Sequence, residues 1–302
     1  MKIILTGSNG LLGQKVADLA LKHSDVELYC FSKGDDRYVS NAENYNYYDI
    51  DLGNLNEVER LLTEINPDAV IHSAAVTNVD FCENNQAICQ SINVDSPLAI
   101  ANYCAANNCH LTFLSTDFIF DGTKNDLYTE EDAANPLSVY GQSKLDAETG
   151  LKTIKGLSCS ILRTCLVFGQ AKALTRSNIA LWAVGALKKG EPLKIVNDQF
   201  RTPTLAEDLA DAVFAFTLNK ISGTYNVSGP DYVSIIDLIS MVAKVFDLSM
   251  DNVASLSSLE LNQPANRPPK TGFDLSKTKS AINYNPRSLE EALKVLRNQL
   301  EA

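Results

Sequence analysis

Short apolar runs alternate with amphipathic stretches along the first half of the chain. The apolar runs lie at 2–6, 26–31, 45–50, 69–72, 111–114 and 156–163. Between them, apolar residues recur at intervals of three and four, as on one helical face of the segment 55–65. Strands that alternate with helices predict an α/β fold with a doubly wound parallel sheet, whose strands are buried on both faces.

The first apolar run leads directly into a glycine-rich turn and then into an amphipathic helix. This order is typical of a Rossmann-type dinucleotide site, where Gly7 makes the tight turn and Gly10 lets the backbone approach a pyrophosphate. Gly13 lets the helix pack closely, and the helix N-terminus attracts the phosphates. The alternative is a plain strand-to-helix turn that needs glycine. The expected dinucleotide contacts here are Gly7, Asn9, Gly10, Leu11, Leu12 and Gly13.

The ends of the following runs bear on which dinucleotide is bound. The second run is followed by Ser32 and Lys33 and lacks the acidic residue that usually binds the ribose of NAD, so NADP(H) is favoured. Lys33 could instead be a solvated turn residue, and NAD(H) stays possible. We expect Asp51 and Leu52 to meet the adenine ring. The fourth run is followed by small residues that let a cofactor lie close to the strand, Ala74 and Ala75.

Polar residues follow the fifth run directly, and a tyrosine–lysine pair comes soon after. Ser115, Thr116 and Asp117 stand where a parallel strand opens onto a cleft. Tyr140 and Lys144 share one face of a predicted helix, one turn apart. We expect Thr116, Tyr140 and Lys144 to converge on one substrate carbonyl, with Lys144 lowering the pKa of Tyr140.

The loop from Asp121 to Asn135 separates these two groups. It carries Asp126, Glu130, Glu131 and Asp132, so we expect a solvated flap at the cleft mouth. The helix after it is expected to begin with Ser138 as its cap.

Two buried polar residues have alternative interpretations. Asn93 lies in a predicted long helix, 84–107, and is either a structural bridge or part of a proton relay. His72, at the end of the fourth run, is expected to be a hydrogen-bonded core residue, although it could face the cofactor.

The regular alternation weakens beyond residue 168. Capping boxes at Thr204 to Glu207 and at Ser288 to Glu291 predict two helix starts. The expected division is a dinucleotide-binding domain of 1–168, to which 198–222 returns, and a smaller interleaved C-terminal substrate lobe formed mainly by 169–197 and 223–302.

Composition narrows the function classes. The chain has 302 residues and a net charge of −11, which argues against a nucleic-acid partner. Its apolar runs are too short to span a membrane, and Met1-Lys2 leads straight into a strand, so a cytoplasmic protein without a signal peptide is expected. The seven cysteines include no Cys-x-x-Cys pair, so we expect reduced thiols and no metal site.

These residues together resemble the extended short-chain dehydrogenases/reductases. The motifs that carry the resemblance are Thr6 to Gly13, Ser115 to Asp117 and Tyr140 to Lys144. Within that family the chain is most similar to the dTDP-4-dehydrorhamnose reductase group, which it matches at Thr77 to Asp80, Ser115 to Gly122, Arg163-Thr164, Asp198 to Phe200 and Arg267-Pro268.

The resemblance implies a chemical role for the chain. It implies an NADP(H)-dependent oxidoreductase that reduces the C4 keto group of a nucleotide-linked 6-deoxysugar, dTDP-4-dehydrorhamnose to dTDP-rhamnose. A homodimer is possible. The implied substrate-binding residues are Thr77, Asp117, Phe118, Arg201 and Arg267.

The substrate diphosphate would need cations from the second lobe. Arg267 is the foremost candidate, because Pro268 and Pro269 stiffen its loop, and the others are Arg176, Arg201 and Lys270. Each could instead be a solvated surface charge. Two other functions stay open: another nucleotide-sugar reductase or epimerase, and a non-catalytic NADP-binding regulatory subunit like the beta subunit of methionine adenosyltransferase.

Overall fold

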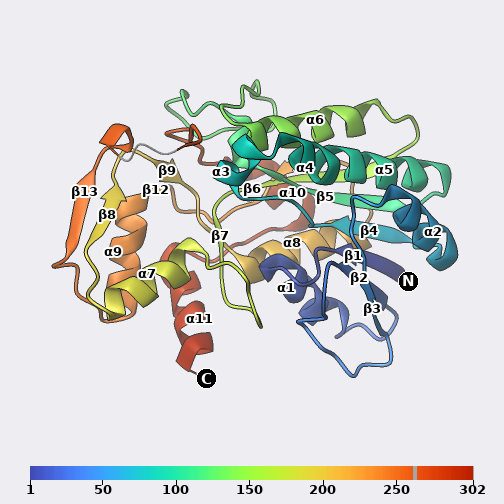
Figure 1. The fold of residues 1–302 in the computed structure, drawn as a ribbon, viewed down its shortest axis with the longest axis horizontal. Coiled ribbons are helices and arrows are strands. Elements are labelled where there is room, and N and C mark those ends of the chain that lie inside the picture. Colours follow the sequence, from blue (N-terminus) through green and yellow to red (C-terminus); the bar gives the residue numbers. More distant parts are fainter. Residues whose placement is uncertain (261–263, 302) are drawn as a thin grey trace.

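In the computed structural model, which describes residues 1–260 and 264–301, seven parallel strands form one central sheet (Figure 1). The strand β1 is flanked by β2 on one side and β4 on the other, so the chain reverses its direction of travel across the sheet there. The predicted α/β fold with a doubly wound parallel sheet is confirmed. From edge to edge the strands are β11 (Gly223–Asn226), β6 (Ser158–Thr164), β5 (His110–Thr116), β4 (Ala69–His72), β1 (Lys2–Thr6), β2 (Glu27–Ser32) and β3 (Tyr45–Asp49).

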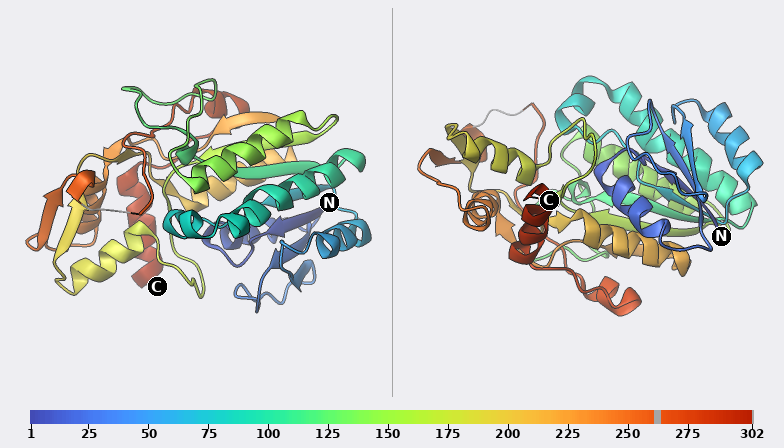
Figure 2. Two further views of the ribbon diagram at one scale, coloured as in Figure 1. Left: turned by 45° about the horizontal axis from the view of Figure 1, so that its top comes forward. Right: turned by 90° about the horizontal axis from the view of Figure 1, so that it is seen from below.

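Helices cover both faces of the sheet (Figure 2). Ile3 and Leu5 of β1 pack into one hydrophobic core, and Ile4 between them packs into the other. Because side chains alternate along a strand, both faces need cover, which explains the continuous apolar runs. The helices of the first face are α1 (Leu11–Ala20) and α8 (Ala206–Leu218), and those of the second are α2 (Leu55–Ile65), α5 (Ser96–Ala106) and α6 (Val139–Thr153).

A third hydrophobic core forms the smaller lobe, at the left of Figure 1. The Ser288 hydroxyl accepts from the Glu291 N–H, and the Glu291 carboxylate accepts from the Ser288 N–H, so this predicted capping box is confirmed. The elements of the lobe are α7 (Ile179–Lys188), β8 (Leu193–Val196), α9 (Ile235–Val245), β13 (Val253–Leu256) and α11 (Leu289–Glu301).

The chain passes between the two parts more than once. The strand β11 completes the central sheet, and α10 (Ser276–Ile282) packs against β11 and α8. Both belong to the segment expected to lie mainly in the substrate lobe, so that boundary is corrected here. Short strands join the parts: β7 (Val167–Phe168) pairs with β10 (Thr204–Leu205), and β9 (Phe200–Arg201) pairs with β12 (Val233–Ser234).

One predicted helix cap is wrong. Thr204 does not cap α8, because its hydroxyl donates to the Cys165 carbonyl and its backbone pairs with β7, while Glu207 pairs with Lys15. The predicted long helix 84–107 is confirmed, because residues 86–106 are helical without a break. It consists of α4 (Gln86–Gln90), a π-helical turn (Ser91–Asp95) and α5, and the short helix α3 (Val79–Asn84) precedes it.

The loop from Asp121 to Asn135 is not the solvated flap that we expected. Tyr128 is buried, with its ring stacked 4.1 Å from that of Phe120. The Glu130 carboxylate accepts from the Asn226 N–H at 2.8 Å. The loop is therefore bound to the strand β11 through Glu130. It is also bound to the segment around Phe273, with which Tyr128 forms a β-bridge. None of the described helices is both long and apolar enough to cross a membrane.

Candidate active site

A cavity of about 760 Å³ opens at the carboxyl ends of the central strands. It brings together all of the predicted cofactor and catalytic residues, together with three of the five predicted substrate residues. They are Gly7, Asn9, Gly10, Leu11, Leu12, Gly13, Ser32, Lys33, Asp51, Leu52, Ala74, Ala75, Thr77, Thr116, Asp117, Phe118, Tyr140 and Lys144. Arg201 and Arg267 lie outside the lining that the described residues form.

The glycine turn forms the phosphate end of this cavity. Gly7 has φ of +70°, and a Cβ there would lie 2.8 Å from the backbone N of Ala74. A Cβ on Gly13 would lie 2.3 Å from the Gly7 carbonyl oxygen, so the α1 turn packs too closely for any side chain. Gly10 is the N-cap of α1 and provides no side-chain cap, which leaves N–H groups of the first turn available to an anion. The turn therefore fits a dinucleotide pyrophosphate.

Basic residues gather at the end of β2. Lys33 Nζ lies 2.6 Å from the Asp51 carboxylate, so these two predicted cofactor contacts pair with each other across the cavity edge. Arg37, which our sequence reasoning missed, also lines the cavity. Its backbone N–H donates to the Asn9 side chain, so Asn9 holds this basic segment beside the glycine turn. A second basic residue shortly after Lys33 was the available signal.

Tyr140 reaches the cavity because α6 begins beside the end of β5. The Ser138 hydroxyl accepts from the Gly141 N–H, which confirms the predicted cap. A Cβ on Gly141 would lie 2.2 Å from the Phe118 carbonyl oxygen, so the first turn of α6 lies directly against the residues after β5. This contact places Tyr140 beside Thr116.

The electrostatics of Tyr140 differ from our expectation. Burial raises the pKa of Tyr140 above its ordinary value, and the neighbouring Thr116 hydroxyl opposes this only in part. Lys144 is not among the main causes of the shift, and its ammonium lies over the Phe113 ring, 4.5 Å from the centroid. The predicted lowering of the Tyr140 pKa by Lys144 is therefore wrong for this structure. Tyr140 keeps its proton at neutral pH, as a proton donor must.

Lys144 is also fully buried, and its charge has a carboxylate neighbour. Burial lowers the pKa of Lys144 to about 8, and Glu148 opposes the shift. Glu148 accepts from Ser115 at 2.6 Å and from Arg163 at 2.8 Å, and it is completely buried. Our sequence reasoning missed Glu148, although it follows Lys144 by four positions on the same helical face.

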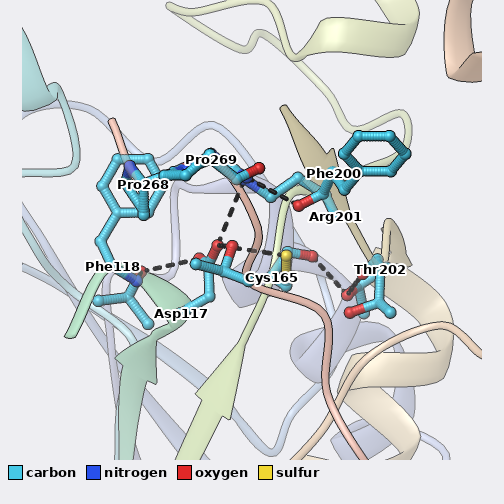
Figure 3. Close-up of polar contacts among 11 residues, drawn as sticks. Asp117, Phe118, Cys165, Phe200, Arg201, Thr202, Pro268 and Pro269 are labelled. Carbon is cyan, nitrogen blue, oxygen red and sulfur yellow. Dashed lines mark hydrogen bonds and ion pairs between the residues drawn. The ribbon is translucent and has the colours of Figure 1, made fainter. Parts of the chain in front are cut away.

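A second buried ion pair involves two residues that were predicted to bind substrate (Figure 3). The Asp117 carboxylate accepts from the Thr271 hydroxyl at 2.5 Å and lies 3.5 Å from Arg201 Nε. The Arg201 guanidinium donates to the backbone carbonyls of Phe200, Pro268 and Pro269. Burial raises the pKa of Asp117, and Arg201 opposes the rise. Asp117 lines the cavity, whereas Arg201 lies behind it.

Two further candidate cations, Arg267 and Arg176, differ in whether they line the cavity. Arg267 donates with two nitrogens to Asp80, at 2.8 and 3.2 Å, outside the cavity. Arg176 lines the cavity and donates to the Thr77 hydroxyl at 3.3 Å. Of these two second-lobe arginines, Arg176 and not Arg267 lines the cavity.

Two buried polar residues connect the cavity wall to its surroundings. Asn93 accepts from the Val76 N–H and donates to Ser143 on α6, so it bridges two segments, as one of its two interpretations requires. His72 forms a hydrogen bond with Thr6 through Nδ1, while its Nε2 has no partner in the described part of the chain. Burial lowers the pKa of His72 to about 3, so the ring stays neutral.

We predict that Lys144→Met stabilises the fold at neutral pH. The pKa of Lys144 falls from 10.5 to about 8 on folding, so burying its charge costs up to about 3 kcal/mol at pH 7. Below pH 8 this cost is complete, and between pH 8 and 10.5 it is relieved as the folded wild type releases its proton. Denaturant unfolding at several pH values should show the advantage of the variant shrinking across that window.

Lys155→Met, an exposed position just after the same helix, is the control and should change the free energy of unfolding by less than about 0.5 kcal/mol. Equal stability of the wild type and Lys144→Met at pH 7 would contradict the buried charge.

The chain is similar to known proteins over its whole length. Residues 1–302 match the family described as RmlD substrate binding domain. A dTDP-4-dehydrorhamnose reductase from Aggregatibacter actinomycetemcomitans is 27% identical over 312 residues, covering 99% of each chain. Methionine adenosyltransferase 2 subunit beta from Bos taurus is 26% identical over 281 residues, 91% of this chain and 81% of that one.

The fold is shared with a solved relative. The crystal structure of a dTDP-4-dehydrorhamnose reductase from Bacillus anthracis, in complex with NADP, is 25% identical and has a TM-score of 0.84, with 99% of each chain covered. Because the family match spans every residue, the chain belongs to the RmlD substrate-binding domain family.

Proposed function

We propose that this protein reduces the C4 keto group of a nucleotide-linked 6-deoxysugar, dTDP-4-dehydrorhamnose, with NADPH. The observation that carries the proposal is that Thr116, Tyr140 and Lys144 meet at one wall of a cavity whose other end is the glycine turn. The names of the reductase relatives support the choice of substrate.

The chain supplies a proton donor and an oriented hydroxyl to this reaction. Bound NADPH would supply the hydride. Negative charge then develops on the substrate oxygen, and Tyr140, protonated because it is buried, donates its proton there. The Thr116 hydroxyl donates to Asp117 in this structure and can rotate toward the same oxygen. Lys144, with a pKa of about 8, is mostly charged at pH 7 and can bind a ribose hydroxyl.

The direct test is an assay of NADPH oxidation with dTDP-4-dehydrorhamnose and with keto sugars linked to GDP or UDP. We expect turnover with the dTDP-linked sugar and formation of dTDP-rhamnose. Turnover with only a GDP- or UDP-linked sugar would move the protein to another nucleotide-sugar reductase class.

Tyr140→Phe should remove the proton donor without changing the cavity shape. We predict that turnover falls by about 100- to 10,000-fold, while the dissociation constant for NADPH stays the same. Tyr103→Phe on α5, outside the cavity lining, is the control and should keep full turnover. Wild-type turnover in Tyr140→Phe would exclude Tyr140 as the acid.

NADPH should be preferred over NADH, because Ser32, Lys33 and Arg37 can hold a 2′-phosphate at the end of β2. We predict that Lys33→Ala combined with Arg37→Ala lowers the ratio of kcat/KM for NADPH to that for NADH by about tenfold or more. Lys22→Ala, an exposed lysine outside the cavity lining, should leave the ratio unchanged. A ratio unaffected by the double substitution would place the 2′-phosphate elsewhere.

The second candidate is a regulatory subunit that binds NADP without turnover. Similarity to methionine adenosyltransferase 2 subunit beta favours it. The complete set of Thr116, Tyr140 and Lys144 favours an enzyme. Measured turnover in the assay above would exclude a purely regulatory subunit. A cytoplasmic location and a homodimer stay predictions from the sequence and the family resemblance.

A further inference from the structure

Arg201 was predicted to bind substrate, but its surroundings give it a different role. It lies in β9 with only 3% of its surface exposed, behind the cavity wall. Its guanidinium donates to the carbonyl of Pro268 at 2.7 Å, and to those of Phe200 and Pro269 at 2.8 and 3.2 Å. These bonds occupy its two terminal nitrogens, so the guanidinium binds other parts of the protein and does not face the cavity (Figure 3).

The two remaining contacts of Arg201 are with residues of the cavity wall. Its Nε lies 3.5 Å from the Asp117 carboxylate, and its guanidinium carbon lies 5.6 Å from the centroid of the Phe118 ring. Asp117 and Phe118 both line the cavity. Arg201 thus joins the wall to the Pro268-Pro269 segment.

Both wall residues contact the catalytic groups directly. Asp117 accepts from the Thr116 hydroxyl at 3.2 Å, and the Phe118 ring meets the Tyr140 ring edge-on at 6.1 Å. A shift of either residue would therefore move Thr116 or Tyr140. The phosphate end of the cavity, built by Gly7 to Gly13, contains none of these contacts.

Because both charges are buried, the Asp117–Arg201 pair is held in one arrangement. Asp117 and Arg201 are each less than 5% exposed, and a buried charge that loses its partner is strongly unfavourable. Thr271 and Cys165 also donate to the Asp117 carboxylate, at 2.5 and 3.3 Å. The carboxylate therefore has one well-determined position while Arg201 is in place.

We propose that Arg201 is a positioning residue that fixes Asp117 and Phe118 against Thr116 and Tyr140, and so shapes the sugar end of the cavity without touching the cofactor. The inference rests on the proposed reductase function. It assigns Arg201 an effect on the sugar nucleotide that is separate from NADPH binding.

Arg201→Lys tests this with the positive charge retained. Lysine keeps a cation near Asp117 but cannot donate to three carbonyls and Asp117 at once. We expect kcat/KM for the sugar nucleotide to fall by about tenfold or more, while the NADPH dissociation constant changes by less than about twofold. A merely structural role would weaken both ligands together or neither, and either result would overturn the proposal.

Two further variants keep the test decisive. Thr271→Val preserves side-chain volume and removes one donor to Asp117, so it should produce a smaller effect in the same direction even if Arg201→Lys folds poorly. Arg287→Lys is the control, because Arg287 also pairs with a buried aspartate, Asp208, and neither of these two residues lines the cavity. An equal loss in Arg287→Lys, or none in Thr271→Val, would overturn the proposal.

Binding of the product separates this inference from the proposed function. If the wild type does not turn over dTDP-4-dehydrorhamnose, the reductase proposal fails, and calorimetry with dTDP-rhamnose in the presence of NADP decides the inference. Weaker binding by Arg201→Lys and Thr271→Val than by the wild type supports it. Equal binding, or no binding by any of the proteins, overturns it.

Discussion

The burial of two ion pairs around the end of β5 is the constraint on which the candidate site depends. Ser115 donates to Glu148, which is paired with Arg163, and Asp117 is paired with Arg201. Thr116 stands between these two attachments. Each pair removes charges from water, which is tolerable only because the surrounding donors and carbonyls satisfy both partners. The strand end is therefore held in place, and with it the Thr116 hydroxyl oxygen, about which only the O–H bond can rotate.

The helix α6 extends the same constraint to the other two side chains of the proposed catalytic set. Tyr140, Lys144 and Glu148 follow one another at intervals of four residues, so one helical face carries all three. Fixing Glu148 to Ser115 and Arg163 fixes the turn that holds Lys144. Burial then acts oppositely on the two acids, raising the pKa of Tyr140 and lowering that of Lys144. The result is a preorganised donor beside a lysine whose pKa is about 8.

Local patterns predicted most of the fold and of the cavity lining. The glycine turn, the continuous apolar runs and the Ser138 cap depend on neighbouring residues, so the sequence displays them directly. The role of Arg201 could not be read in this way, because its partners Asp117 and Pro268 are distant in the sequence. The sequence around Thr204 is typical of a helix cap, but its backbone pairs with β7 and its hydroxyl donates to the Cys165 carbonyl. The Tyr140 pKa shift had the opposite sign to our expectation, since desolvation depends on the complete tertiary packing.

The central claim is that the cavity transfers a hydride from NADPH to the sugar carbonyl beside Tyr140. The most direct measurement is to supply NADPH deuterated at the transferable position, together with dTDP-4-dehydrorhamnose, and to locate the deuterium by NMR. We predict deuterium at C4 of the dTDP-rhamnose produced. Consumption of NADPH without deuterium at C4, or no consumption at all, would contradict the claim.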